Sequence, residues 1–295
     1  MIKRTIYLGS PVYLSMHLEQ MKVNQIEKNK EVFIPVEDIG MILLDHPRIT
    51  ITHGLIRALQ ENKAVIISCD EQHLPQGMML PLAGNTLQSR QQKFQLAASG
   101  ALKKNCWQQT ITAKIYNQKR LLQHLGLPAK RLEVLEKRVL SGDSTNVEGQ
   151  AAQYYWAHLF EDFFREREGE PPNNLLNYGY AILRSMVARG IVSSGLLPGQ
   201  GIFHKNQYNP YCLADDLMEP YRPFIDYLVW QLHEKGVRDL NSKDTKARLL
   251  SIATMDGNFK GKRKPLMVGI ATTTASLVKC YDGSRRKLIY PEIVL

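Results

Sequence analysis

The stretch RQQKFQLAASGALKKNCWQQTITAKIYNQKRLLQHLG, residues 90–126, carries apolar residues three and four positions apart, and its pattern stops at Gly126 and Pro128. This spacing is typical of a helix, and a glycine followed by a proline commonly ends one. The residues before this stretch follow a different pattern. The change predicts an α+β chain in which a small β-rich N-terminal domain precedes a larger all-α helical-bundle domain.

Short β-rich runs fill the chain from Thr5 to about Leu82 and predict strands, because they are rich in Val, Ile, Tyr and Thr and are separated by turn-prone residues. The stretch HGLIRALQEN, residues 53–62, is predicted as one short helix. The polar segment at 81–92 marks the boundary, so we assign residues 1–88 to the β-rich domain and 89–295 to the helical domain. The runs are TIYLG, VYLSM, EVFIPV, IGMILLD, ITIT, AVIISCD and MMLPL.

Further helical patterns continue to about residue 235, and the loop GNFKGKRKP at 257–265 is the only stretch of low complexity. The helical patterns cover LEVLEKRVLSG, the residues after Glu148, LLNYGYAILRSMVARGIV and the stretch from about Pro210 to Lys235.

The composition is that of an ordinary globular protein, with 295 residues, 44% hydrophobic and 22% charged. We find neither a signal-like N-terminus nor an apolar run of the roughly 18 residues that a membrane span requires, so we expect a cytoplasmic protein without a membrane partner. The four cysteines form no C-x-x-C pair. A zinc knuckle and a disulfide framework are therefore not indicated.

The positive charge is concentrated in the second domain. The net charge is +10, and residues 1–95 hold 10 Lys and Arg against 9 Asp and Glu, which leaves 28 against 19 for the remainder. A basic domain is typical of a polyanion partner, because each neutralised phosphate releases condensed counterions. A soluble basic surface without such a partner is the alternative.

Glu148 lies on the apolar stripe of a predicted helix. A carboxylate in a first helical turn is favoured by the helix dipole, so a surface glutamate is one interpretation. Its position on the stripe favours an inward-facing carboxylate, which needs a cation, a metal or hydrogen-bond donors beside it. The apolar members of this stripe are Ala152, Tyr155, Trp156, Leu159, Phe160 and Phe163.

The stretch FHKNQYNPYCLADDLMEPYRP, residues 203–223, holds one histidine and three carboxylates. Asp216 and Glu219 lie three positions apart on a predicted helix and project about 60° from one another, close enough to act on one ion or one phosphate. An acidic pair on a solvated helix face is the alternative. His204 follows the loop GLLPGQGIF, which we expect to reverse the chain and bring the imidazole near this helix.

One imidazole with several carboxylates suits Mg²⁺ or Mn²⁺ better than a structural Zn²⁺ site, which prefers cysteine and histidine. In a basic domain, such an ion predicts chemistry on a phosphodiester, where it would activate a hydroxyl and offset the charge on the phosphoryl oxygens. Candidate DNA contacts around the cluster are polar or basic: Lys114, Gln118, Arg184, Arg189, Lys205, Asn206, Arg222, Lys260, Lys262, Arg263 and Lys264.

Several motifs together resemble the family of CRISPR-associated protein one, the integrase and endonuclease of CRISPR adaptation, in a form similar to its type II branch. They are NVEGQAAQYYW, KIYNQ and the long stretch from LNYGYAILRSMVARGIVSSGLLPGQGIFHKNQYNP to DLMEPYRP, together with the order of a β domain before a helical one. The resemblance implies that the first domain serves dimerisation and partner contact, and that the second is the catalytic domain that binds metal and DNA.

The resemblance also implies a catalytic metal set of Glu148, His204 and Glu219. Asp216 matches an acidic position that assists in some branches, and Asp215 competes with it for the place that faces the metal. The implied partners are a duplex protospacer, the CRISPR repeat, a second copy of the chain and a small second CRISPR adaptation protein, with other type II CRISPR proteins as further candidates. The implied reaction is attack of a DNA 3′-hydroxyl on a phosphodiester, which inserts the duplex into the repeat array.

Three other functions are compatible with the same residues. A structure-specific nuclease would use the same site with water in place of the 3′-hydroxyl. A DNA-binding scaffold would keep the acidic cluster for structure only. A small-molecule metallohydrolase is less compatible, because the second domain is basic.

Overall fold

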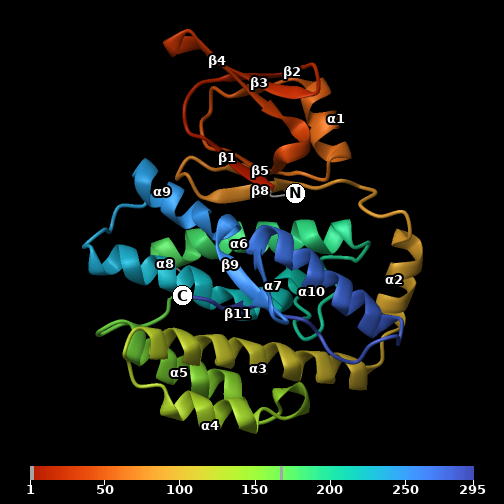
Figure 1. Ribbon diagram of the computed structural model, residues 1–295, viewed down its shortest axis with the longest axis vertical. Helices are drawn as coiled ribbons and strands as arrows, with labels where there is room; N and C mark the ends of the chain where they lie inside the picture. The colour runs from red at the N-terminus through yellow and green to blue at the C-terminus, as the bar shows by residue number, and fades with distance from the viewer. Residues whose placement is uncertain (1–2, 167–168) are drawn as a thin grey trace.

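The computed structural model describes residues 3–166 and 169–295, and it shows a β domain at one end of a larger helical domain (Figure 1). The predicted α+β class, with strands first and helices after them, is confirmed. No helix in these two described ranges is long and apolar enough to cross a membrane.

Two four-stranded sheets build the β domain. The first has the order β1-β5-β7-β8, in which β8 is the antiparallel strand, and the second has the order β4-β3-β2-β6. Helix α1 (His53–Glu61) is the predicted short helix. The strands are β1 Arg4–Leu8, β2 Tyr13–His17, β3 Gln20–Gln25, β4 Lys30–Pro35, β5 Ile39–Leu44, β6 Thr50–Ile51, β7 Val65–Cys69 and β8 Pro75–Met79, with 3₁₀ turns Ile26–Lys28 and Val36–Asp38.

The central strands of the first sheet are apolar on both faces, because both faces are covered. Met41 and Ile67 belong to the core shared with the helical domain, whereas Ile42 and Ile66 belong to the core beneath α1. Strand β3 was not predicted. Its sequence QMKVNQ has only Met21 and Val23 as buried apolar residues, so the alternating pattern is short and surrounded by polar residues.

Helix α6 runs through the middle of the helical domain, and α3 is the longest helix (Figure 1). The helices are α2 Gln88–Ala97, α3 Gly100–His124, α4 Lys130–Arg138, α5 Val147–Leu159, α6 Asn173–Ser193, α7 Cys212–Met218, α8 Arg222–Glu234, α9 Lys243–Leu250 and α10 Leu266–Tyr281, with 3₁₀ turns Ser141–Asp143 (η3), Glu219–Tyr221 (η4) and Ser251–Thr254 (η5). Helix α2 begins next to the predicted boundary at residue 88, which itself stays a prediction.

The stretch 90–126 forms two helices and not one. Helix α2 ends at Ala97, and the Ser99 side chain caps α3 by accepting a hydrogen bond from the Leu102 amide at 3.2 Å. A serine at this position competes for backbone amides and begins a new helix.

The segment 257–265, expected as a loop, forms a β-hairpin instead. Strands β9 (Asp256–Phe259) and β10 (Lys262–Pro265) pair across Lys260 and Gly261, which both have positive φ, as tight hairpin turns require. Strand β11 (Glu292–Ile293) adds a third strand, so the helical domain also contains a small sheet.

Candidate metal centre

Glu148 stands in the first turn of α5, and its position is fixed by caps on that turn. The Asn146 side chain accepts a hydrogen bond from the Gly149 amide. The Asp143 carboxylate accepts from the amides of Val147 at 2.8 Å and Glu148 at 3.0 Å. Because these carboxylate and amide oxygens satisfy the free amides of the helix, the Glu148 side chain is left to point into the domain.

Glu219 follows α7 in the turn η4 and is 4% exposed. Its Oε1 accepts a hydrogen bond from Arg222 Nε at 2.8 Å. Its Oε2 is buried and forms an ion pair with the Lys114 ammonium at 2.6 Å. Burial would raise the pKa of this carboxyl, but Arg222 and Lys114 outweigh it, and the net shift is downward.

Lys114 of α3 joins the two predicted glutamate ligands. Its Nζ lies 2.7 Å from Glu148 Oε1 and 2.6 Å from Glu219 Oε2, and the lysine is 9% exposed. Burial alone would lower the pKa of the ammonium, but Glu219 and Glu148 reverse this effect and raise it. Lys114 was predicted as a DNA contact. The structure places it inside the carboxylate cluster.

His204 is held by Asp216, which is completely buried. His204 Nδ1 lies 2.5 Å from Asp216 Oδ1, and Asp216 Oδ2 accepts hydrogen bonds from the amides of Ile202 and Phe203. The hydrogen bond to Asp216 raises the pKa of His204. Asp216 therefore lies behind the imidazole and orients it, which leaves Nε2 free to bind a ligand.

The loop that carries His204 is also fixed by an aromatic contact. Phe203 stacks on Trp107 of α3, with ring centroids 4.4 Å apart and planes 2° apart, and the His204 ring meets the edge of both. Asp215, the neighbour of Asp216, is occupied elsewhere: it accepts from Arg184 Nε and from Asn209 Nδ2, both at 2.6 Å. Neither Asp215 nor Asp216 lies between the two glutamates.

The other predicted DNA contacts lie in several different parts of the structure. Lys205 and Asn206 are exposed beside His204, whereas Gln118 is 3% exposed inside α3. Arg189 donates to the Lys63 carbonyl of the β domain. The remaining contacts are Arg184 at Asp215, Arg222 at Glu219, and Lys260, Lys262, Arg263 and Lys264 in the β9–β10 hairpin.

The site contains the carboxylate oxygens that a divalent ion needs, but those of Glu148 and Glu219 contact the Lys114 ammonium. Within residues 3–166 and 169–295, no three His, Cys, Asp or Glu side chains converge on a single ion position. One ammonium, that of Lys114, lies between Glu148 and Glu219 and neutralises both carboxylates. Two carboxylates that share one cation, with Glu219 buried, are what a carboxylate site for Mg²⁺ or Mn²⁺ would show with an ammonium in place of the metal.

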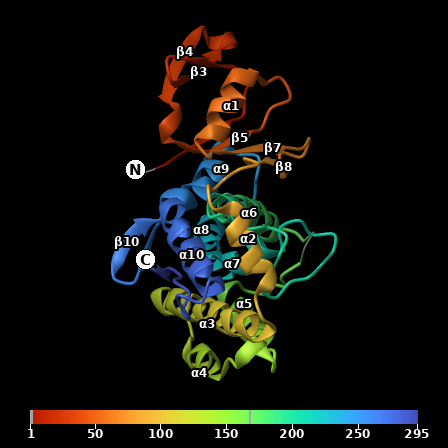
Figure 2. The same cartoon turned by 90° about the vertical axis from the view of Figure 1, so that its right-hand side faces the viewer.

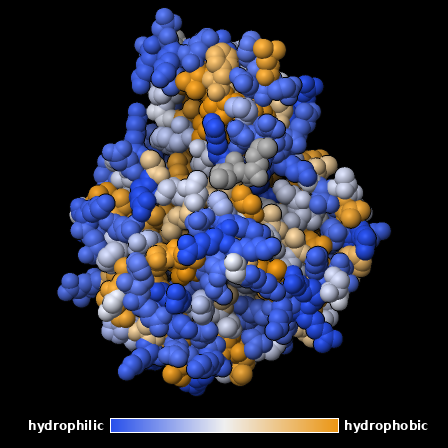
Figure 3. Space-filling view, viewed as in Figure 1, coloured by the Kyte–Doolittle hydropathy of each residue, from blue (hydrophilic) through white to orange (hydrophobic). Residues whose placement is uncertain are grey.

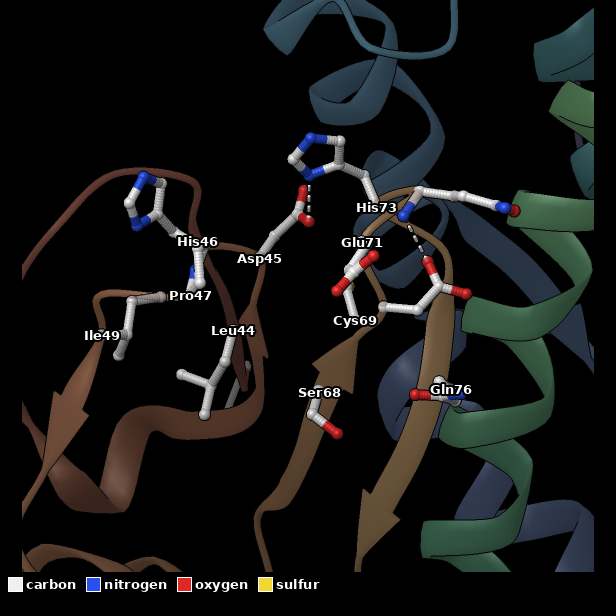
Figure 4. Close-up of a pocket in the computed structure, with 12 residues that line it drawn as sticks. Leu44, Asp45, His46, Pro47, Ile49, Ser68, Cys69, Glu71, His73 and Gln76 are labelled. Carbon is white, nitrogen blue, oxygen red and sulfur yellow. Dashed lines mark hydrogen bonds and ion pairs between the residues drawn. The ribbon is translucent and has the colours of Figure 1, made fainter.

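A second cluster of charged residues lies at the carboxyl ends of β5 and β7, and its pattern was not recognised in the sequence. Asp45 is 3% exposed and accepts hydrogen bonds from Tyr7 at 2.7 Å, His73 at 2.8 Å and Lys246 at 2.6 Å. Figure 4 shows His73 and Asp45 facing one another in a hollow of about 920 Å³. Lys246 comes from α9, so this buried ion pair links the two domains.

The fold is shared with solved structures of a casposase and of Cas1 proteins. A casposase bound to integration product matches with a TM-score of 0.77 at 20% identity, over 97% of this chain and 92% of the casposase. A Cas6-RT-Cas1–Cas2 complex matches with a TM-score of 0.73 at 19% identity, over 99% of this chain and 36% of the matched one. The class is therefore the two-domain fold that a casposase shares with Cas1.

The family follows from the sequence comparison. The family model for CRISPR associated protein Cas1 matches residues 6–255. The CRISPR-associated endonuclease Cas1 of Neisseria meningitidis serogroup C (strain 8013) is 40% identical over 235 residues, which cover 79% of this chain and 77% of that protein. The chain belongs to the Cas1 family, and the predicted resemblance is confirmed.

Proposed function

We propose that this chain is a metal-dependent DNA endonuclease and integrase that inserts short duplexes into a CRISPR repeat array. The observation that carries this proposal is the meeting of Glu148 and Glu219 at one cation, with His204 oriented by Asp216 in the adjacent loop. The Neisseria relative is named an endonuclease, and the casposase of the same fold was solved with an integration product.

Glu148, Glu219 and His204 would hold Mg²⁺ or Mn²⁺, the two glutamates through their carboxylates and His204 through Nε2. When bound, the ion would lower the pKa of the attacking hydroxyl and offset the negative charge on the phosphoryl oxygens. Lys114 would have to leave its place between the glutamates, because a metal ion and an ammonium cannot occupy the same position.

The residues around the ligands have separate roles. Asp216 fixes the His204 ring and keeps the proton on Nδ1, so that Nε2 presents a lone pair. Arg222 holds Oε1 of Glu219 through Nε and keeps its positive charge beside the site. The displaced Lys114 ammonium remains on α3 next to the reacting phosphate, where it can stabilise the negative charge of the transition state.

The reaction is a transesterification. The 3′-hydroxyl oxygen of the incoming duplex forms a new bond to phosphorus at the repeat boundary, while the bond to the leaving 3′-oxygen of the repeat breaks and that oxygen takes up a proton. We propose a homodimer and a Cas2 chain as partners, in line with the Cas6-RT-Cas1–Cas2 complex of the same fold.

The test is a product assay with the purified chain, a Cas2 partner, a short duplex and a supercoiled plasmid that bears a repeat array. Mn²⁺ is expected to support joining at the repeat edge, and EDTA, His204→Ala or a dideoxy-ended duplex is expected to abolish it. Nicking that proceeds equally with the dideoxy-ended duplex, without any joined product, would show a nuclease and refute the integrase.

A further inference from the structure

Gln118 of α3 is a buried polar side chain that has no role in the metal centre described above. It is 3% exposed, and its Oε1 has no hydrogen-bond partner among the residues that the structure describes. Figure 3 shows many hydrophilic side chains on the surface of the helical domain, where an amide can bond to water. Figure 2 shows α3 between α4 on one side and α7 and α10 on the other, as does Figure 1, so a buried side chain of α3 must find its partners inside the protein.

The other buried side-chain amides of the described chain use their oxygens. Asn117, the residue before Gln118, accepts a hydrogen bond from the Ile293 amide at 2.9 Å. The oxygens of Gln95 and Asn173 likewise each accept a hydrogen bond from a backbone amide. A buried acceptor without a partner costs free energy, so the unbonded Oε1 of Gln118 needs an explanation.

Lys114 lies four positions before Gln118, on the same face of α3. Side chains four positions apart are neighbours on a helix, with Cβ atoms about 5 to 6 Å apart. The side chain of a helical residue leans toward the N-terminus of its helix, so Gln118 lies over the turn that carries Lys114. The Lys114 ammonium can therefore reach Oε1 of Gln118 by rotation of the lysine side chain, without movement of α3.

In the structure the Lys114 ammonium contacts stronger acceptors than this amide. Its Nζ lies 2.7 Å from Glu148 Oε1 and 2.6 Å from Glu219 Oε2, and hydrogen bonds to carboxylates are stronger than hydrogen bonds to a neutral amide oxygen. An ion between the two glutamates would remove both contacts and leave a buried ammonium without a partner. Burial of an unpaired charge costs far more than burial of an unpaired amide, so the displaced ammonium needs a new acceptor.

We propose that Gln118 Oε1 is a second position for the Lys114 ammonium, which it takes when an ion binds between Glu148 and Glu219. Gln118 is then a positioning residue that acts on the metal centre through Lys114. The proposal rests on the function proposed above, because it is the bound ion that displaces the lysine. It also explains the unbonded acceptor in the interior, since Oε1 gains its partner when the ion binds.

The experiment measures Mn²⁺ affinity by electron paramagnetic resonance in four chains: the parent chain, Gln118→Met, Lys114→Met and the double variant. Methionine keeps most of the volume of glutamine but offers no oxygen. Gln118→Met is expected to bind Mn²⁺ about 10- to 100-fold more weakly than the parent chain, which is the range that a hydrogen bond to a charged group contributes. In the Lys114→Met background, the same substitution is expected to change the affinity by less than about twofold, because no ammonium needs an acceptor.

Thermal unfolding in EDTA separates this role from a structural one. Because Oε1 of Gln118 has no partner before the ion binds, Gln118→Met is expected to keep or raise the Tm of the parent chain. Asn117→Leu is the matched control, since it removes a bonded amide from the same helix and is expected to lower Tm. A loss of Tm in Gln118→Met as large as that in Asn117→Leu would show a structural residue and would overturn the proposal.

Gln118→Glu gives a second test, because it keeps an acceptor oxygen at the same reach and adds a charge that favours the ammonium. Its Mn²⁺ affinity is expected to equal or exceed that of the parent chain. Binding as weak as in Gln118→Met, or an equal effect of Gln118→Met with and without Lys114, would overturn the proposal. If the parent chain binds Mn²⁺ and Gln118→Met binds it equally well, the second position alone is wrong. If the parent chain shows no saturable Mn²⁺ binding, the proposed metal centre is wrong and the second position with it.

Discussion

Lys114→Met tests whether the lysine takes the place of the metal. The substitution keeps the length and most of the volume of the side chain but removes the charge. At 2.7 Å and an effective dielectric constant of about 20, one ammonium–carboxylate contact is worth about 6 kcal/mol before desolvation is subtracted. Because removal of one partner leaves buried Glu219 facing Glu148, the expected net loss of unfolding free energy is about 3 to 5 kcal/mol.

The assay is thermal unfolding in EDTA and in Mn²⁺. A loss of this size lowers Tm by roughly 6 to 20 °C, taking roughly 2 to 4 °C per kcal/mol. Mn²⁺ is expected to restore most of this loss in Lys114→Met, since an ion at 100 times its Kd contributes about 2.7 kcal/mol. The stabilisation of the parent chain by Mn²⁺ is expected to be smaller, because the ion must first displace the ammonium.

Lys119→Met is the matched control. Lys119 lies on the same helix and pairs with Glu136 at 2.6 Å, with side chains that are 13% and 20% exposed. This variant loses a comparable ion pair outside the site, and Mn²⁺ should raise its Tm no more than it raises the Tm of the parent chain. If Lys114→Met is as stable as the parent chain in EDTA, or if Mn²⁺ stabilises both variants equally, the stand-in role of Lys114 is wrong.

Three further predictions concern other buried carboxylates. Asp216→Asn should lower the rate of metal-dependent nicking about 10- to 100-fold with little change in Tm, because it releases the His204 ring; a rate equal to that of the parent chain would contradict this role. Burial raises the pKa of Asp226 from 3.8 to about 6, although hydrogen bonds from Tyr180 and Tyr155 act in the opposite direction. The contribution of Asp226 to stability is therefore present below pH 3.8 and is lost as the pH rises through about 6. Urea unfolding between pH 4 and 7 should show a loss of roughly 3 kcal/mol in the free energy of unfolding that is absent in Asp226→Asn. Lys246→Met should cost about 3 to 5 kcal/mol by removing the buried ammonium from Asp45 at the domain junction, and proteolysis that is no faster than in the parent chain would count against this link.

The sequence was sufficient for the order of the domains, because the period of the apolar residues changes near residue 88 and both patterns are long. It was insufficient where few apolar residues mark an element. Strand β3 has two, and the β9–β10 hairpin was obscured by its lysines and glycines. Pairing with neighbouring strands determines these elements, and single-sequence patterns do not report it.

The candidate site was predicted in its residue types but not in its connections. Glu148 stood out because it lies on an apolar stripe, and His204 and Glu219 stood out because one histidine and three carboxylates are clustered within residues 203–223. The identity of those partners depends on contacts between distant segments: Lys114 lies 105 positions before Glu219, and Lys246 lies 201 positions after Asp45. A lysine in a helical pattern is indistinguishable from a surface charge until the helix is packed, so the sequence did not show that Lys114 lies between the two glutamates.

The most direct measurement for the metal centre is a titration of the apo chain with Mn²⁺ followed by electron paramagnetic resonance. Glu219→Gln keeps the shape of the side chain and removes the charge, and Asp215→Asn does the same at a carboxylate that is bound to Arg184 and Asn209. The account predicts saturable Mn²⁺ binding that is lost in Glu219→Gln and retained in Asp215→Asn. Equal Mn²⁺ binding by the parent chain and Glu219→Gln would contradict it.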